Sequence, residues 1–278
     1  MSYTATLPKR PQFGETSRTD TWWMQPLWVF IGFTAFIVYS TWAALQGTDI
    51  KHCYYWYGGW GANYLSPFYS PALFGSEPHP GIFGVMPSWW PTFLPFSPAF
   101  FIMWIPAGFR FTCYYYRGAY YKAFWLDPVN CAVGEPRNTY LGERYFPLII
   151  QNVHRYFMYL AVIFIVILGR DAWDGFWFKD ISGVEHFGMG VGSLILVANV
   201  ILLGGYTLGC HSLRHLVGGF LDSFSKSSAC TGCYNAVSCL NRRHMLWAWL
   251  SLIWVGVTDG YIRICAMGII TDFRFFTF

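Results

Sequence analysis

Charged residues are scarce in this chain. Of its 278 residues, 12% are charged and 55% are apolar, whereas soluble domains have roughly 25% charged residues. This composition excludes an ordinary soluble domain. The formal net charge of +4 is too small to indicate a nucleic-acid partner. No apolar run precedes Trp22, so we expect no signal peptide. The sequence also lacks internal repeats and low-complexity tracts.

The sequence is instead rich in long apolar segments and in aromatic residues. A membrane-spanning helix needs about 20 mostly apolar residues. Five segments meet this length: residues 26–45, 91–109 with a helical extension after it, 146–169, 187–209 and 245–267. The 26 Phe, 19 Tyr and 15 Trp suit interfacial belts at the membrane surfaces. We predict an all-α membrane protein with an N-terminal arm, residues 1–25, and a single domain of five spanning helices, residues 26–278.

Lys and Arg give the orientation, because they are enriched on the cytoplasmic side. With the N-terminus in the cytoplasm, the inner side holds Lys9, Arg10, Arg18, Arg110, Arg117, Lys122, Arg137, Arg144, Arg155, Arg214, Lys226, Arg242 and Arg243. The outer side holds Lys51, Arg170, Lys179, Arg263 and Arg274. We therefore predict an inner N-terminus and an outer C-terminus. Residues 46–90 then form a long outer loop, ordered because it is rich in aromatic residues. Residues 118–145 and 216–243 form inner loops, and residues 170–186 form a second outer loop.

This topology brings reactive side chains to one depth at the inner face. Cys113 ends the second predicted helix, His154 opens the third, and His244 opens the fifth. Cys210, His211 and His215 end the fourth. Ionisable groups within a membrane are candidates for function. The set of two Cys and four His suggests a metal centre, although a buried Cys is often a small apolar residue.

Two metal centres fit these residues. A two-haem bundle fails because the first helix has no His and the second offers only Cys113. One b-type haem could use two of His154, His211, His215 and His244. Two Cys and two His also suit a Rieske-type [2Fe–2S] cluster, although the C-x-H boxes of soluble Rieske domains are absent.

Other polar residues have separate interpretations. Cys230, Cys233 and Cys239 in the second inner loop could hold zinc with Cys131 or His244. Cys53 and Cys265 lie toward the outer side, and we expect them to be inert. Arg155 and Arg214 either reach toward headgroups or bind an acidic partner or a quinone carbonyl. Asp259 and Arg263 are four residues apart and can pair on one helix face.

Several segments resemble a known family. They are RTDTWWMQPL (18–27), FRFTCYYYRGAYYKAFW (109–125), QNVHRYF (151–157), GCHSLRHLVGG (209–219), LNRRH (240–244) and TDFRFF (271–276). The chain resembles the five-helix membrane anchor of succinate:quinone oxidoreductase, in the single-subunit form of mycobacteria and related bacteria. The similar segments are spread over nearly the whole length.

The resemblance implies a subunit of respiratory complex II in the bacterial cytoplasmic membrane. A flavoprotein subunit and an iron–sulfur subunit would be its partners, and a higher oligomer of the complex is compatible with it. The chain would pass electrons to menaquinone or ubiquinone and perform no succinate chemistry itself. The family's mycobacterial type implies a membrane-embedded Rieske-like cluster, here with Cys113 and Cys210 as thiolates and His154 and His244 as imidazoles. His211 and His215 are reserve ligands.

A fainter similarity concerns the quinone and haem sites of classical anchor subunits. QNVHR is similar to their S-x-x-H-R box, which implies a quinone near Gln151 and Arg155, with Arg214 and His215 close by. SLRHL followed by Asp222 is similar to their G-I-R-H-L-x-x-D box. Leu208 occupies the place of the haem-ligating His of that box. Two rivals remain, a haem-b subunit of another respiratory oxidoreductase and a transporter, which would have polar or broken helices near the membrane midplane.

Overall fold

A computed structural model describes residues 11–46, 54–75, 81–84, 88–91, 93, 96–137, 144–146, 148–219 and 227–278. Cys53 and Asp222 fall outside these ranges. The chain divides into two compact units. The smaller combines Met1–Ala35 with Phe111–Asn152, and the larger combines Phe36–Arg110 with Val153–Phe278.

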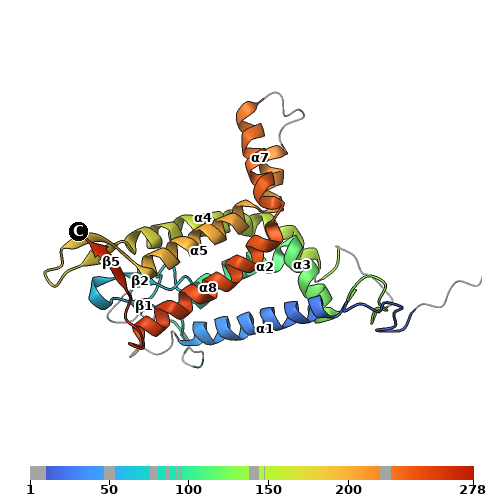
Figure 1. Cartoon of the computed structure of the whole chain (residues 1–278), viewed down its shortest axis with the longest axis horizontal. Helices are drawn as coiled ribbons and strands as arrows, with labels where there is room; N and C mark the ends of the chain where they lie inside the picture. Colours follow the sequence, from blue (N-terminus) through green and yellow to red (C-terminus); the bar gives the residue numbers. More distant parts are fainter. Residues whose placement is uncertain are drawn as a thin grey trace, which may run out of the picture. The chain divides into compact units, whose positions relative to one another are not determined.

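The chain is a mostly helical membrane protein. In the described ranges, four helical segments are long and apolar enough to cross a membrane: Met24–Leu45, Ile149–Asp174, Val191–Leu208 and His244–Ala266. They contain helices α1 (Met24–Leu45), α4 (His154–Asp174), α5 (Val191–Leu208) and α8 (His244–Ala266). In the larger unit, α5 packs against both α4 and α8 (Figure 1). The sequence prediction of these four spanning segments is confirmed, with different boundaries.

The predicted second span is shorter than expected. Helix α2 runs from Phe100 to Thr112, whereas the sequence suggested a start at Pro91. Pro98 explains the late start, because proline has no N–H and disfavours a helical conformation of the residue before it. Thirteen residues rise about 20 Å, less than the roughly 30 Å of a bilayer core. The fifth apolar helix is therefore real but short.

Two other helix boundaries differ from the prediction. Helix α4 starts at His154 after the 3-10 turn η4 (Leu148–Val153) and extends to Asp174. Its polar last turn is satisfied because Arg170 pairs with Asp174 at 2.8 Å and Ser70 donates to Asp171. Helix α5 starts at Val191 because the preceding residues form a strand.

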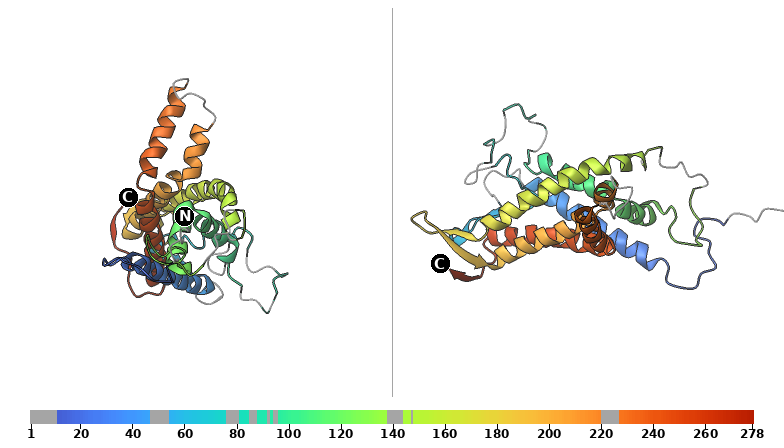
Figure 2. Two further views of the ribbon diagram at one scale, coloured as in Figure 1. Left: turned by 90° about the vertical axis from the view of Figure 1, so that its right-hand side faces the viewer. Right: turned by 90° about the horizontal axis from the view of Figure 1, so that it is seen from above.

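Helices replace much of the predicted second inner loop. Helix α6 (His211–Gly218) and helix α7 (Ser228–Asn241) pack against each other, and α7 projects from the end of the α4–α5–α8 bundle (Figures 1 and 2). Ser227 caps α7 by accepting a hydrogen bond from the backbone N–H of Cys230. The apolar pattern of α7 is weak, which is why the sequence suggested a loop.

Small antiparallel sheets add to the helices. Strands β3 (Trp177–Lys179), β4 (Glu185–Gly190) and β5 (Arg274–Thr277) form one sheet in that order. Strands β1 (Trp56–Tyr57) and β2 (Tyr64–Leu65) form another, separated by the 3-10 turn η2 (Gly59–Gly61). The latter sheet lies in the loop that we predicted to be ordered, and the described residues 54–75 of that loop are packed.

The smaller unit joins the N-terminal arm to the segment after α2. Helix α3 (Tyr114–Tyr120) continues into the π-helical turn η3 (Tyr121–Trp125). Phe33 of α1 packs edge-on against Tyr116, with ring centroids 5.1 Å apart. Arg18 pairs with Asp20 and donates to the carbonyl of Cys131. The arm is therefore anchored to the loop that follows η3.

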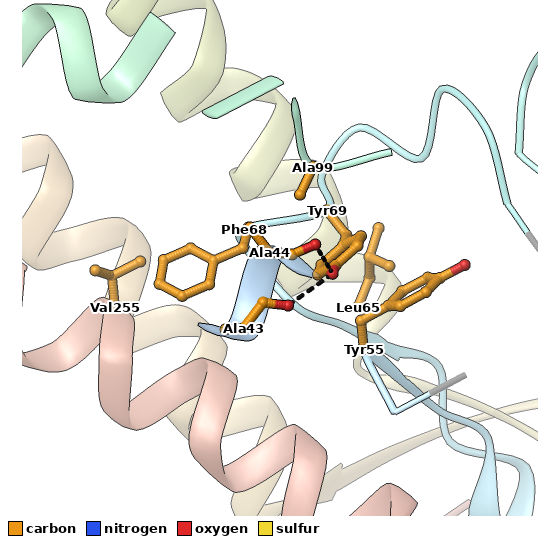
Figure 3. Close-up of a cluster of buried hydrophobic side chains, with 8 residues drawn as sticks. All are labelled: Ala43, Ala44, Tyr55, Leu65, Phe68, Tyr69, Ala99 and Val255. Carbon is orange, nitrogen blue, oxygen red and sulfur yellow. Dashed lines mark hydrogen bonds between the residues drawn. The ribbon is translucent and has the colours of Figure 1, made fainter. Parts of the chain in front are cut away.

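The core of the larger unit lies where α1 ends. Figure 3 shows a cluster made of Ala43, Ala44, Tyr55, Leu65, Phe68, Tyr69, Ala99 and Val255. The hydroxyl of Tyr69 donates to the carbonyls of Ala43 and Ala44 at 2.8 and 3.0 Å. These bonds satisfy the last carbonyls of α1, which have no partner within a helix. The 54–75 segment thus caps α1.

A buried ion pair lies next to this cluster. Arg263 Nε donates to Asp259 Oδ2 at 2.7 Å, and the side chains are 2% and 0% exposed. Arg263 Nη2 also donates to the carbonyl of Ala43 at 2.9 Å. Asp259 accepts from the hydroxyls of Tyr39, at 2.6 Å, and Ser66. The predicted pairing of Asp259 with Arg263 is confirmed, and it ties α8 to α1 and to the 54–75 segment.

Asp272 also joins separate elements through hydrogen bonds to its carboxylate, at the start of α5. Its carboxylate accepts hydrogen bonds from the Tyr64 hydroxyl (2.8 Å), the Tyr261 hydroxyl (2.6 Å) and the backbone N–H of Gly192 (2.9 Å). Negative charge near a helix N-terminus is favourable. We expect Asp272→Asn to lower the free energy of unfolding by about 1–3 kcal/mol, because an amide cannot accept all three bonds.

Thermal unfolding of the purified complex measures the effect of Asp272→Asn. Glu185→Gln is the matched control, because the Glu185–Lys179 pair is exposed and such pairs contribute about 0–1 kcal/mol. An unchanged melting temperature for Asp272→Asn would contradict a stabilising role of its carboxylate.

Candidate functional site

His154 and Cys210 are in direct contact in the larger unit. His154 is the first residue of α4, and its Nε2 lies 3.0 Å from the Sγ of Cys210. The exposed fractions are 8% for His154 and 1% for Cys210. The His154 ring stacks on Phe109 of α2, with centroids 4.8 Å apart and planes 8° apart. The contact brings together two of the side chains that the sequence singled out.

Cys210 lies at a break between two helices. Helix α5 ends at Leu208, and Cys210 has an extended backbone with φ −67° and ψ 142°. It is the N-cap of α6, where its Sγ accepts a hydrogen bond from the backbone N–H of Ser212 at 3.4 Å. The prediction that Cys210, His211 and His215 end the fourth spanning helix is therefore wrong in detail. Cys210 lies in the break, and both His residues lie on the helix that follows.

Cys113 occupies the same kind of position in the smaller unit. It follows the last residue of α2, is 2% exposed, and has an extended backbone with φ −64° and ψ 133°. It is the N-cap of α3. Both predicted thiolate ligands thus occupy the N-cap position of a short helix directly after an apolar one, and the Sγ of Cys210 accepts a capping hydrogen bond there. Helix N-termini favour negatively charged groups, so both positions suit a thiolate.

His244 opens α8, as the sequence predicted. Its ring stacks on Tyr206, with centroids 5.0 Å apart, and Tyr206 meets Phe109 edge-on at 5.3 Å. His154, Cys210 and His244 therefore surround one aromatic packing layer of the larger unit.

Arg110 is a residue of this region that the sequence interpretation missed as part of a site. Its guanidinium lies 4.6 Å from the ring centroid of Tyr206. It donates to the carbonyl of Ala248 (3.2 Å) and to the hydroxyl of Ser251 (2.9 Å), and it lies within electrostatic range of His244. In the sequence, Arg110 contributes only to the charge bias. Its position one residue after Phe109, near the end of an apolar helix, was the available signal.

The described side chains do not form a closed metal cage. Within the ranges that the structure describes, no three Cys, His, Asp or Glu side chains gather closely enough to hold a metal ion. In the described part of the chain, no such group forms around Cys230, Cys233 and Cys239, for which the sequence suggested a zinc site. All three lie on α7, and at about 100° per residue a helix directs Cys239 away from the other two.

Gln151 lies in the smaller unit. Its Nε2 donates to the Tyr120 hydroxyl at 2.8 Å and to the carbonyl of Phe111 at 3.4 Å. Tyr120 stacks on Phe111 with ring planes 9° apart. Burial raises the pKa of Tyr120 to about 12, so its hydroxyl stays protonated at neutral pH. Because Gln151 donates to the Tyr120 oxygen, the hydroxyl proton can be directed to another acceptor.

The remaining predicted quinone residues belong to the larger unit. Arg155 is exposed. Arg214 donates to Ser238 Oγ at 3.0 Å and to the Tyr234 hydroxyl at 2.7 Å, which joins α6 to α7. His215 is exposed and lies against His211, with ring centroids 4.5 Å apart. Partial burial lowers the pKa of His211, and His215 and Arg214 lower it further.

Comparisons with known proteins identify the family. The sequence model described as actinobacterial succinate dehydrogenase subunit SdhC matches residues 24–268. The chain is 44% identical to a chain of the Mycobacterium smegmatis Sdh1 complex in the apo form. That match covers 97% of this chain and 98% of the other, with a TM-score of 0.83. No curated protein matches. The chain belongs to the family of actinobacterial SdhC proteins, the multi-pass membrane subunits of bacterial succinate dehydrogenase.

Proposed function

We propose that this subunit passes electrons from an iron–sulfur subunit to a quinone in the membrane, through a Rieske-type [2Fe–2S] cluster. Cys113 and Cys210 would supply the thiolates, and His154 and His244 the imidazoles. The observation that carries the proposal is the buried 3.0 Å contact between His154 Nε2 and Cys210 Sγ. This contact places an imidazole and a thiol side by side in an apolar layer.

The chemistry of the donors fits such a cluster. Thiolate and imidazole are the two ligand types of Rieske centres, and imidazole raises the reduction potential relative to all-thiolate ligation. When bound, the cluster would accept and release single electrons. Both cysteines occupy helix N-cap positions, and helix N-termini stabilise negative charge. The stacking of His154 on Phe109 and of His244 on Tyr206 fixes the planes of both imidazoles.

The chain's own residues define the surroundings of the site. Cys113, Cys210 and His154 are buried, which excludes water from the donors. Arg110 places a positive charge against the Tyr206 ring on which His244 stacks, and it donates to the Ala248 carbonyl and the Ser251 hydroxyl. A nearby cation favours the addition of an electron. Arg110 would therefore help electrons to enter this layer.

We further propose that the quinone binds near Gln151 and Arg155, with Arg214 and His215 close by. Tyr120 supports this placement, because its protonated hydroxyl can donate to a quinone carbonyl while Gln151 holds its oxygen. The quinone would be menaquinone or ubiquinone. Protons that reach the reduced quinone would come from the aqueous face that the exposed Arg155 and His215 mark.

The assembly and orientation follow from the same proposal. The related M. smegmatis chain comes from an Sdh1 complex, and we infer a flavoprotein subunit and an iron–sulfur subunit as partners of this chain. The proposed N-terminus is cytoplasmic, so that the Cys and His residues lie on the face where the iron–sulfur subunit docks. Family membership decides against the transporter alternative and against a subunit of another type of oxidoreductase.

Electron paramagnetic resonance of the dithionite-reduced complex tests the cluster. We expect a Rieske-like signal in the wild type that Cys113→Ser and His244→Ala both abolish, because each removes a ligand. Cys239→Ser is the control, since Cys239 lies exposed on α7, and it should keep the signal.

Two outcomes would contradict the proposed cluster. A Rieske-like signal that survives both Cys113→Ser and His244→Ala would refute the ligand set. A sharp haem α band in the reduced-minus-oxidised optical spectrum would replace the cluster by a haem between two of His154, His211, His215 and His244.

A further inference from the structure

We propose that His211 and His215 form a surface site for a divalent transition-metal cation of the Zn²⁺ type, next to the buried site of His154 and Cys210 but made of other side chains. Both residues lie on α6, four positions apart. Side chains with this spacing are neighbours on one helix face. Their ring centroids are 4.5 Å apart with planes at 81°. Two imidazoles held this closely can bind one ion through a nitrogen from each ring, at about 2.0–2.1 Å.

The two rings lie on the surface of the described chain. Both residues are exposed, whereas His154 is 8% exposed. Among the residues that the structure describes, neither ring nitrogen of His211 or His215 forms a hydrogen bond or an ion pair. No rearrangement of existing bonds is needed before an ion binds. Water can complete the coordination, as it does at zinc sites that keep an open position.

The neighbouring charge does not prevent binding. Arg214 lies between the two His residues in the sequence, but its guanidinium donates to Ser238 and Tyr234 of α7. It also lies 5.0 Å from the ring centroid of Tyr234. Its positive charge is therefore held by α7. The donors are imidazoles without a carboxylate, which favours Zn²⁺, Cu²⁺ and Ni²⁺ over Mg²⁺ and Ca²⁺.

Occupation of the site would inhibit electron delivery to the quinone. His215 is one of the residues that we place beside the quinone, so this consequence rests on the proposed function. An ion bound to His215 removes its imidazole nitrogen from hydrogen bonding with a quinone carbonyl. It also adds positive charge at the exposed end of the site. Zn²⁺ should therefore slow quinone reduction.

Copper binding to the intact complex tests the site itself. The probe is Cu²⁺ chelated by iminodiacetate, which leaves coordination positions for two adjacent imidazoles. We expect the EPR spectrum of the oxidised complex to show one copper with two imidazole nitrogens. His211→Gln and His215→Gln should each weaken binding by about tenfold or more, because even the outer-shell partners of a metal ligand contribute that much. Both residues are exposed, so neither change threatens folding.

His186→Gln is the matched control for copper binding. His186 is a partly exposed histidine on β4, and its ring contacts the Phe278 carbonyl and Asp180. This variant should bind copper like the wild type. Equal copper affinity in the wild type and in both α6 variants would overturn the site, and so would a signal from a single nitrogen.

The inhibitory consequence is tested separately with Zn²⁺. Each variant's rate of quinone reduction is normalised to its own metal-free rate. Inhibition of the wild type should require about tenfold less Zn²⁺ than inhibition of His211→Gln. Equal sensitivity would overturn the inhibitory role even if copper binds as expected. Failure of the proposed cluster would instead appear as a missing Rieske-like signal, with copper binding unaffected.

Discussion

Arg263→Gln is expected to reduce the free energy of unfolding by about 3–5 kcal/mol, because it leaves the buried carboxylate of Asp259 without its counter-charge. The wild-type pair is 2.7 Å apart, and its side chains are 2% and 0% exposed. Asp259→Asn should have a similar cost, since the guanidinium of Arg263 would then be the uncompensated charge. Thermal unfolding of the purified complex measures both effects.

A double-mutant cycle separates the ion pair from the hydrogen bonds around it. In Asp259→Asn with Arg263→Gln, neither position is charged, while amide groups still face Tyr39, Ser66 and the Ala43 carbonyl. We expect the double variant to lose clearly less stability than the sum of the single variants, with a coupling energy of about 0.5–3 kcal/mol. Additive losses would show that the two side chains stabilise the protein independently.

Cys210→Ser is expected to lower the rate of succinate-dependent quinone reduction by about 100-fold or more, since a lost ligand should cost at least as much as an outer-shell partner. Succinate oxidation with a soluble dye as electron acceptor should stay near the wild-type rate, because that chemistry belongs to the partner subunits in the proposed function. The ratio of the two rates is the measurement.

Folding does not explain the expected loss in Cys210→Ser. Cys210 is the N-cap of α6, and serine is among the residues that helix N-caps prefer. The melting temperature should therefore remain close to that of the wild type. Cys239→Ser replaces an exposed residue of α7 and should preserve both rates. If Cys210→Ser reduced quinone at the wild-type rate, Cys210 could not be an essential ligand.

The sequence predicted the existence of the spanning helices better than their ends. Apolar length is a property of one segment, and it identified four segments that are long enough to cross a membrane. The ends depend on partners elsewhere in the chain. Residues 187–190 look like the start of a helix but pair with β3 and β5. Asp171 lies in the last turn of α4 because Ser70, from a distant loop, donates to it.

The candidate site could likewise be predicted only in part: the properties of single segments are visible in the sequence, and the contacts between segments are not. Chain topology alone placed His154 and His244 at helix starts. The sequence did not predict the helix break at Cys210 because residues 187–209 are mostly apolar, even though a glycine such as Gly209 commonly follows the end of a helix. Stacking of Phe109 and Tyr206 on the imidazoles depends on contacts between separate helices, which periodicity does not reveal.

The spacing of Asp259 and Arg263 has a consequence for how the protein is inserted into the membrane. Each charge alone would oppose entry of α8 into the bilayer, by less than the ~2.5–3.5 kcal/mol of a charge at a helix centre, because both residues lie in the C-terminal half of α8. Because the two residues are one helical turn apart, they can neutralise each other as soon as α8 is helical. Neither charge then needs a partner on another helix while α8 enters the membrane. Tyr39 and Ser66 then complete the hydrogen bonding of Asp259 when the bundle assembles.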